Sequence, residues 1–200
     1  MKQAQQAGTH EITAGPVLVL IRGLPGSGKS YLAAALRDRI GDDKVVLLDP
    51  DTIDYASDKY ITLSKSLAAE GIEEKFYPNR FLKAEAYQAI GEHRIIIWNQ
   101  PFTEPGGFDR TIASVRAAAD EQHIPLPILL VEVEVNHETA KQRIAVRKEQ
   151  GGHGPSADRF ARFIDDYVSF ADRGHPTIVV RGDSDVSESV SIVIEALQAL

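Results

Sequence analysis

The most informative motif in the sequence is Gly23-Leu24-Pro25-Gly26-Ser27-Gly28-Lys29-Ser30. It fits the pattern G-x-x-x-x-G-K-[ST], with an apolar run before it and an amphipathic helical pattern after it. Glycines let a loop curl so that several backbone N–H groups face one anion, and the following helix adds the positive end of its dipole. The pattern therefore predicts a phosphate-binding loop rather than an ordinary glycine-rich turn.

The loop also predicts roles for its residues. Lys29 is expected to reach the β- and γ-phosphates of a nucleotide as a positive charge, and the Ser30 hydroxyl is expected to bind Mg²⁺. ATP and Mg²⁺ are the predicted cofactors. The predicted nucleotide-binding residues are Gly23, Pro25, Gly26, Ser27, Gly28, Lys29, Ser30 and Tyr31.

Short apolar runs alternate with helical patterns along the chain. The runs are rich in β-branched residues, which is typical of strands buried on both faces of a parallel sheet. They cover residues 16–21, 45–48, 95–98, 128–135 and 177–180. The helical patterns cover residues 29–40, 81–90, 108–122, 137–148, 156–170 and 187–200, with long loops expected at 99–107 and 150–155. This alternation predicts a three-layer α/β fold. Only Glu132 and Glu134 alternate with valines, which predicts one wetter strand face.

The size and composition of the chain fit a single domain over residues 1–200. With 43% hydrophobic and 26% charged residues, the chain has ordinary globular composition and enough length to bury a core. The absence of cysteine excludes a disulfide scaffold, a thiol nucleophile and a Cys-ligated metal site. Residues 1–14 are expected to be a flexible N-terminus without a signal peptide. Because no apolar window is long enough to span a membrane, we expect a cytoplasmic protein without a membrane partner.

Two aspartates follow the second predicted strand, in the stretch VVLLDPDTID at residues 45–54. Asp49 and Asp51 come just past the carboxyl end of the strand, where open α/β sheets bind ligands. One carboxylate is expected to hold Mg²⁺ through water, and another to accept a proton from an attacking hydroxyl. The structural alternative is a turn with a helix N-cap, which Asp-Pro-Asp-Thr also favours. The phosphate loop nearby favours the functional interpretation.

Positive charge gathers in residues 141–162, which hold six cations and two acids. This segment carries +4 in a chain of net charge −7, so the remainder carries −11. Arg143 and Arg147 are one helical turn apart, and a glycine-rich stretch at 151–155 interrupts the helix. We expect a lid that closes over phosphates, with both arginines stabilising the transferring phosphoryl group. The alternative is a solvated helix face.

Residues 55–92, between the second and third strands, are expected to form substrate-side helices, with a purely structural helical pair as the alternative. The predicted partners are a nucleotide and a small molecule that offers a hydroxyl group. The acidic net charge argues against nucleic acid, although nucleic-acid ends stay an alternative acceptor.

The order strand, GLPGSGKS, helix, VVLLDPD and arginine-rich lid resembles small P-loop kinases, in particular the zeta-toxin and polynucleotide-kinase-like group of AAA-type ATP-binding proteins. The resemblance implies a P-loop NTPase fold with a five-stranded, mainly parallel sheet in the order 2-3-1-4-5 and a helical lid. It also implies that Asp51 is the catalytic base. Related kinases often end the third strand with Asp, whereas this chain has Asn99, which leaves Asp49 to orient Mg²⁺.

The resemblance implies an ATP- and Mg²⁺-dependent kinase with Lys29, Asp51, Arg143 and Arg147 as catalytic residues. Its acceptor would be a hydroxyl of a small molecule, a nucleoside or a nucleotide sugar. Two alternatives stay open: a zeta-toxin-like toxin component with a protein antitoxin as its partner, and a module that binds or hydrolyses ATP without an acceptor.

Overall fold

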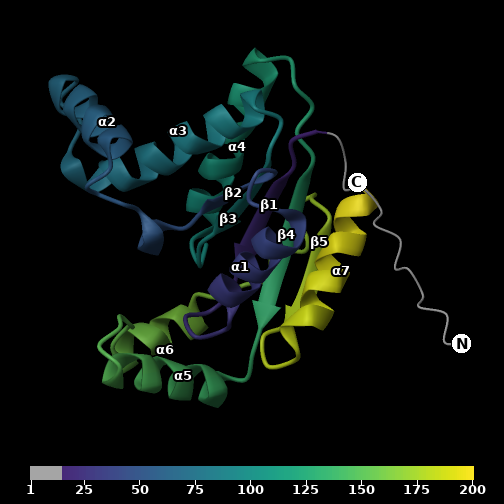
Figure 1. The fold of residues 1–200 in the computed structure, drawn as a ribbon. Coiled ribbons are helices and arrows are strands. Elements are labelled where there is room, and N and C mark those ends of the chain that lie inside the picture. The colour runs from purple at the N-terminus through teal and green to yellow at the C-terminus, as the bar shows by residue number, and fades with distance from the viewer. Residues whose placement is uncertain (1–14) are drawn as a thin grey trace, which may run out of the picture.

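The computed structural model describes residues 15–200 (Figure 1). The predicted flexible N-terminus, residues 1–14, lies outside the described residues. Five strands pair in the order β2-β3-β1-β4-β5, and every pairing is parallel. The predicted fold class and strand order are therefore confirmed. The strands are β1 (Leu18–Arg22), β2 (Val45–Leu48), β3 (Ile95–Asn99), β4 (Ile128–Glu134) and β5 (Thr177–Arg181).

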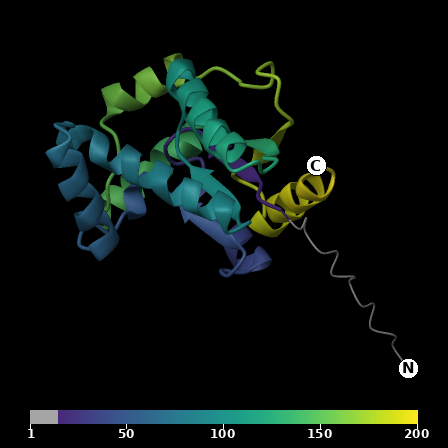
Figure 2. The ribbon, with the colours of Figure 1, turned by 90° about the horizontal axis from the view of Figure 1, so that it is seen from above.

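Helices cover both faces of the sheet. They are α1 (Lys29–Ile40), α2 (Asp58–Ala69), α3 (Tyr77–Gly91), α4 (Pro105–Glu121), α5 (His137–Glu149), α6 (Ala157–Asp165) and α7 (Val186–Gln198), with 3₁₀ turns η1 (Pro50–Thr52) and η2 (Glu74–Phe76). Helices α1 and α7 pack on one face and α3 and α4 on the other (Figure 2). No helix within residues 15–200 has the length and apolar character needed to cross a membrane.

Strand β1 explains why the apolar runs lack clean alternation. Leu18 and Leu20 point into the cluster under α3 and α4, whereas Val19 and Ile21 point into the cluster under α1 and α7. All four side chains are fully buried. A strand in the middle of a three-layer fold has no wet face, which explains why these four successive positions are all apolar.

Several element boundaries differ from the predictions. The helix expected from residue 81 begins at Tyr77. The loop expected at residues 99–107 is shorter, because α4 begins at Pro105, whose ring suits the first position of a helix. The helix expected over residues 156–170 ends at Asp165. The chain then leaves the helix, and the Phe170 amide donates to the Glu132 carboxylate 2.6 Å away.

The prediction of a wetter face at Glu132 is wrong. Glu132 is only 2% exposed and forms an ion pair with Arg22, at 2.7 Å between Nη1 and Oε1. The Arg22 guanidinium also lies against the rings of Tyr167 and Phe170, at 4.2 and 3.6 Å from their centroids. The acid in β4 is thus the partner of the arginine directly before the phosphate loop. Glu134, in contrast, is exposed.

Candidate active site

The phosphate loop connects β1 to α1 and depends on two glycines with positive φ. Gly26 and Gly28 have φ angles of 82° and 98°, which side-chain-bearing residues rarely adopt. A Cβ atom at Gly26 would also lie 2.6 Å from the carbonyl oxygen of Ala140 in α5. The loop therefore needs glycine both for its curl and for the close approach of α5.

Gly23 and Ser27 pack beneath the loop. A Cβ atom at Gly23 would lie 2.6 Å from Ser27 Oγ and 2.7 Å from the carbonyl oxygen of Val133 in β4. Ser27 is fully buried, and its hydroxyl has no hydrogen-bond partner among the described residues. Both positions are packed inside the loop, and neither lines the cavity described next.

A cavity of about 480 Å³, here called the central cleft, lies at the carboxyl ends of β1, β2 and β3. It brings together most of the predicted site residues. Of the predicted set, only Gly23, Ser27 and Arg143 do not line it. The predicted residues that line it are Pro25, Gly26, Gly28, Lys29, Ser30, Tyr31, Asp49, Asp51 and Arg147.

Asn99 joins the two residues predicted to hold a metal. Its Nδ2 donates to Ser30 Oγ at 2.9 Å and to Asp49 Oδ2. The other Asp49 oxygen accepts the Asp51 amide at 2.9 Å and so caps η1. Asp49 therefore caps a helix, as the structural alternative predicted, and it also lines the central cleft.

The arrangement around Asn99 fits Mg²⁺. Asn99 Oδ1 is buried without a hydrogen-bond partner within residues 15–200, which is unusual unless a water or an ion completes the site. The described residues contain no group of three or more His, Asp or Glu that would hold a metal alone. Mg²⁺ commonly takes one or two protein ligands together with phosphate oxygens and water. Ser30 and Asp49 are the residues that would hold it.

Lys29 lies at the start of α1, close to both aspartates. Burial lowers the pKa of its amine, while the charges of Asp49 and Asp51 raise it and that of Arg147 lowers it. A partly desolvated ammonium group gains more from a bound anion than one in free water. This environment suits a lysine that neutralises phosphate charge.

The two lid arginines have different surroundings. Arg147 lines the central cleft, and its guanidinium makes no hydrogen bond or ion pair with the described residues. Arg143 instead donates to the carbonyl oxygens of Gly26 and Gly182, at 3.3 and 2.8 Å. The structure thus places Arg147 where the prediction needs it and makes Arg143 a brace of the loop backbone. Their catalytic roles stay predictions.

The segment predicted to be a lid rests on the phosphate loop. Leu24 packs against Ala140 and Ile144 of α5 and Phe160 of α6. Figure 1 shows α5 and α6 together at the end of the sheet toward which β4 and β5 point. The closing motion of this segment stays a prediction.

The loop between β5 and α7 belongs to the site, and the sequence analysis missed it. A Cβ atom at Gly182 would lie 1.8 Å from the carbonyl oxygen of Ser27, so the two loops are in direct contact. Arg181, Gly182 and Ser184 line a cavity of about 330 Å³, here called the β5-side cavity. The rule that selected Asp49, namely position after a strand's carboxyl end, also applies to Gly182.

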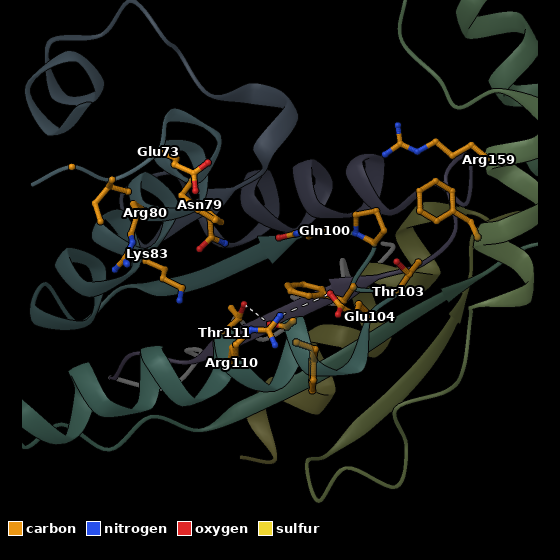
Figure 3. A pocket seen from close by; sticks show the side chains of 18 residues that line it. Glu73, Asn79, Arg80, Lys83, Gln100, Thr103, Glu104, Arg110, Thr111 and Arg159 are labelled. Carbon is orange, nitrogen blue, oxygen red and sulfur yellow. Dashed lines mark hydrogen bonds and ion pairs between the residues drawn. The ribbon is translucent and has the colours of Figure 1, made fainter. Parts of the chain in front are cut away.

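A third cavity, here called the α3–α4 pocket, is larger than the other two, at about 820 Å³ (Figure 3). It lies between η2, α3, α4 and α6 and shares Gln100, Pro101, Arg159 and Phe163 with the central cleft. The predicted substrate-side segment contributes to it through residues 71–83. Helix α2 does not line it.

The fold and the loop together define the class of the protein. A parallel sheet in the order β2-β3-β1-β4-β5 with a phosphate loop after β1 is the fold of P-loop kinases. Residues 18–168, which are more than half of the chain, match the AAA domain family, and the chain belongs to that family.

Solved structures with this fold include several kinases. A candidate kinase from Chloroflexus aurantiacus is 17% identical with a TM-score of 0.61, covering 93% of this chain and 98% of its own. A gluconokinase from Sinorhizobium meliloti is 14% identical with a TM-score of 0.55, covering 94% of each chain. A deoxyadenosine kinase from M. mycoides with bound dATP is 15% identical with a TM-score of 0.52, covering 90% of this chain and 98% of its own.

A search of curated proteins finds no match to the chain. The likeness to the zeta-toxin and polynucleotide-kinase-like group therefore rests on the Asp-x-Asp motif and the arginine-rich lid, and it stays a prediction.

Proposed function

We propose that this protein is a kinase that transfers the γ-phosphoryl group of ATP to a hydroxyl group of a small molecule. The observation that carries the proposal is a row of three adjoining cavities, two of which are lined by the phosphate loop. The β5-side cavity shares Gly26, Gly28 and Arg147 with the central cleft, and the central cleft in turn adjoins the α3–α4 pocket. A nucleotide and an acceptor would have separate sites that meet in the central cleft.

The donor side of this arrangement suits ATP. We place the base in the β5-side cavity and the phosphates along the loop, where Lys29 neutralises their charge. Ser30 and Asp49 would hold Mg²⁺, and bound Mg²⁺ neutralises charge on the β- and γ-phosphates. Arg147 lines both cavities and is available to the phosphoryl group in transfer.

The acceptor side depends on Asp51. Its carboxylate faces the central cleft and has no hydrogen bond or ion pair with residues 15–200, so it is free to take a proton. As the acceptor oxygen bonds to the γ-phosphorus, the bond to the bridging oxygen of ADP breaks, and the hydroxyl proton passes to Asp51. ADP leaves with the bridging oxygen.

A small-molecule acceptor is favoured over plain hydrolysis for two reasons. An enzyme that only hydrolyses ATP needs no further cavity of about 820 Å³ adjoining the cleft at its phosphate loop. The similar structures also include proteins named as a gluconokinase and a deoxyadenosine kinase.

The test is a panel of hydroxyl compounds with γ-labelled ATP and Mg²⁺, using Lys29→Ala as the blank. Asp51→Asn should lower kcat about 10²- to 10⁴-fold, the usual contribution of a general base, while ATP still binds. Asp54→Asn is the matched control, because Asp54 is an exposed acid nearby that bonds only to its own turn. Full turnover by Asp51→Asn would overturn the assignment of the base. Labelling of no compound above the blank would overturn the kinase proposal.

A further inference from the structure

Cations from three helices line the α3–α4 pocket (Figure 3). Arg80 and Lys83 come from α3, Arg110 from α4 and Arg159 from α6. Arg80 and Lys83 are one helical turn apart, whereas α4 follows only after β3 and α6 lies much further along the chain, so the fold brings the four charges to one cavity. In a chain of net charge −7, this cavity stands out as a local concentration of positive charge.

The acids of the pocket do not neutralise these cations. Glu73 lies 2.8 Å from Lys75 rather than beside a cation of the pocket, measured between Nζ and Oε2, and both side chains are exposed to water. Glu104 reaches Arg110 only at 3.9 Å, and the two side chains are 78% and 72% exposed, so water screens the pair. Within residues 15–200, Arg80 and Lys83 have no hydrogen bond or ion pair with any acid.

The surroundings of Lys83 disfavour the charged form of its amine. Burial lowers the pKa of its amine, and the charges of Arg80 and Arg110 lower it further. A bound anion would relieve both effects, since an opposite charge within a few ångströms stabilises the protonated amine. The cavity is also within the usual size range for small-molecule sites.

We propose that the acceptor carries an anionic group, a carboxylate or a phosphate, which binds Arg80, Lys83 and Arg110 in the α3–α4 pocket. Its hydroxyl group extends past Gln100, which lines both cavities, toward Asp51 in the central cleft. The inference rests on the proposed function, because it names the chemical class of the acceptor in that reaction.

Paired acceptors test the inference. Each pair has the same hydroxyl skeleton with and without an anion: gluconate and glucitol, glucose 6-phosphate and glucose, a nucleoside monophosphate and its nucleoside. In the pair that is used, we expect the anionic member to have at least tenfold higher kcat/KM. The gluconate and phosphate arms tell a carboxylate from a phosphate. Equal or better use of the neutral member would overturn the inference.

Variants locate the effect in the pocket. Arg80→Gln and Lys83→Gln should each raise KM for the anionic acceptor at least tenfold, with little change for its neutral partner and in KM for ATP. Lys44→Gln is the control. Lys44 is an exposed cation just before the amino-terminal end of β2, whereas the cleft lies at the carboxyl end of that strand. An equal loss with both members of the pair would instead indicate a structural role.

A binding measurement separates this inference from the kinase proposal. Acetylation of lysines by N-hydroxysuccinimide acetate is followed by mass spectrometry, in inorganic phosphate and in sodium chloride of the same ionic strength. Phosphate should slow labelling of Lys83 at least threefold and leave Lys44 unchanged. If phosphate protects Lys83 from acetylation but no acceptor compound is phosphorylated, the anion site is retained and the kinase proposal is overturned. Phosphorylation of a neutral acceptor without protection of Lys83 would do the reverse.

Discussion

Asn99 organises the predicted metal site without adding a charge to it. Its amide donates to Ser30 and Asp49 at once, so both oxygens are held close together at the loop. An aspartate at the end of β3, as in many kinases that this chain resembles, would repel Asp49 until a cation bound. The amide would therefore hold Ser30 and Asp49 together before Mg²⁺ binds, without adding an acid from β3.

Gly182 offers a test of the loop contact at the scale of one residue. Gly182→Ala should weaken ATP binding at least tenfold, because the new Cβ atom would lie 1.8 Å from the Ser27 carbonyl oxygen and must push the phosphate loop away. Titration with a fluorescent ATP analogue measures the change, and circular dichroism checks the fold. Gly15→Ala is the control, since a Cβ atom there meets nothing within 4 Å. Unchanged affinity in Gly182→Ala would show that the loop contact has no role in binding.

At the scale of elements, Arg22 and Glu132 connect β1, β4 and the segment that follows α6. Arg22 also donates to the carbonyl oxygen of Val168 at 2.8 Å, and Ser169 Oγ donates to Glu132 at 3.1 Å. The chain after α6 is thereby fixed to the sheet directly below the phosphate loop. This connection explains why a charged pair stands in the core of a three-layer fold.

Removing the negative partner of this pair should be strongly destabilising. Glu132→Gln should lower the free energy of unfolding by about 3–5 kcal/mol, because it leaves the buried Arg22 guanidinium without a counter-charge. Urea unfolding measures the difference. Glu134→Gln, two residues further on the same strand and exposed, should change stability by about 0.5 kcal/mol or less. Equal stability of the two variants would mean that the ion pair contributes nothing.

At the scale of the whole molecule, the proposed nucleotide site draws on elements from both halves of the chain. The loop before α1, helix α5 and the loop before α7 all line the β5-side cavity or the central cleft. A ligand that contacts all of them would stabilise the folded chain as a unit, because it binds the native state only.

This stabilisation can be measured directly. At about 100 times its Kd, ATP with Mg²⁺ should add about 2.7 kcal/mol and raise Tm by roughly 5–10 °C. Lys29→Ala should abolish most of the rise, whereas Lys44→Ala should keep it. Because burial lowers the pKa of Lys29, its amine loses its proton at a pH below its ordinary pKa of 10.5. The ATP-dependent rise should therefore shrink as the pH approaches that value from below. A rise that is independent of Lys29 would contradict the proposed nucleotide site.

Local patterns predicted most of the fold and part of the site. The strands and the phosphate loop depend on neighbouring residues, through apolar runs and through glycines followed by Lys29 and Ser30, so a sequence reveals them. The burial of Glu132 was predicted wrongly, because it depends on a pairing with Arg22, which lies 110 residues earlier. The helix was also predicted to run past Asp165, whereas Val168 and Phe170 instead bond to this pair. The contact of Gly182 with the loop has the same long-range origin.

The sequence alone determined the class of fold and the chemistry of the phosphate loop, since both follow from short motifs and from the alternation of strands and helices. Only the tertiary structure decided that Arg143 braces the loop while Arg147 lines the cleft, and that Arg80, Lys83 and Arg110 share a pocket. A cavity takes its charge and shape from several elements that are separated in the chain. No local pattern describes their combination, because it arises only when the elements pack around the parallel sheet.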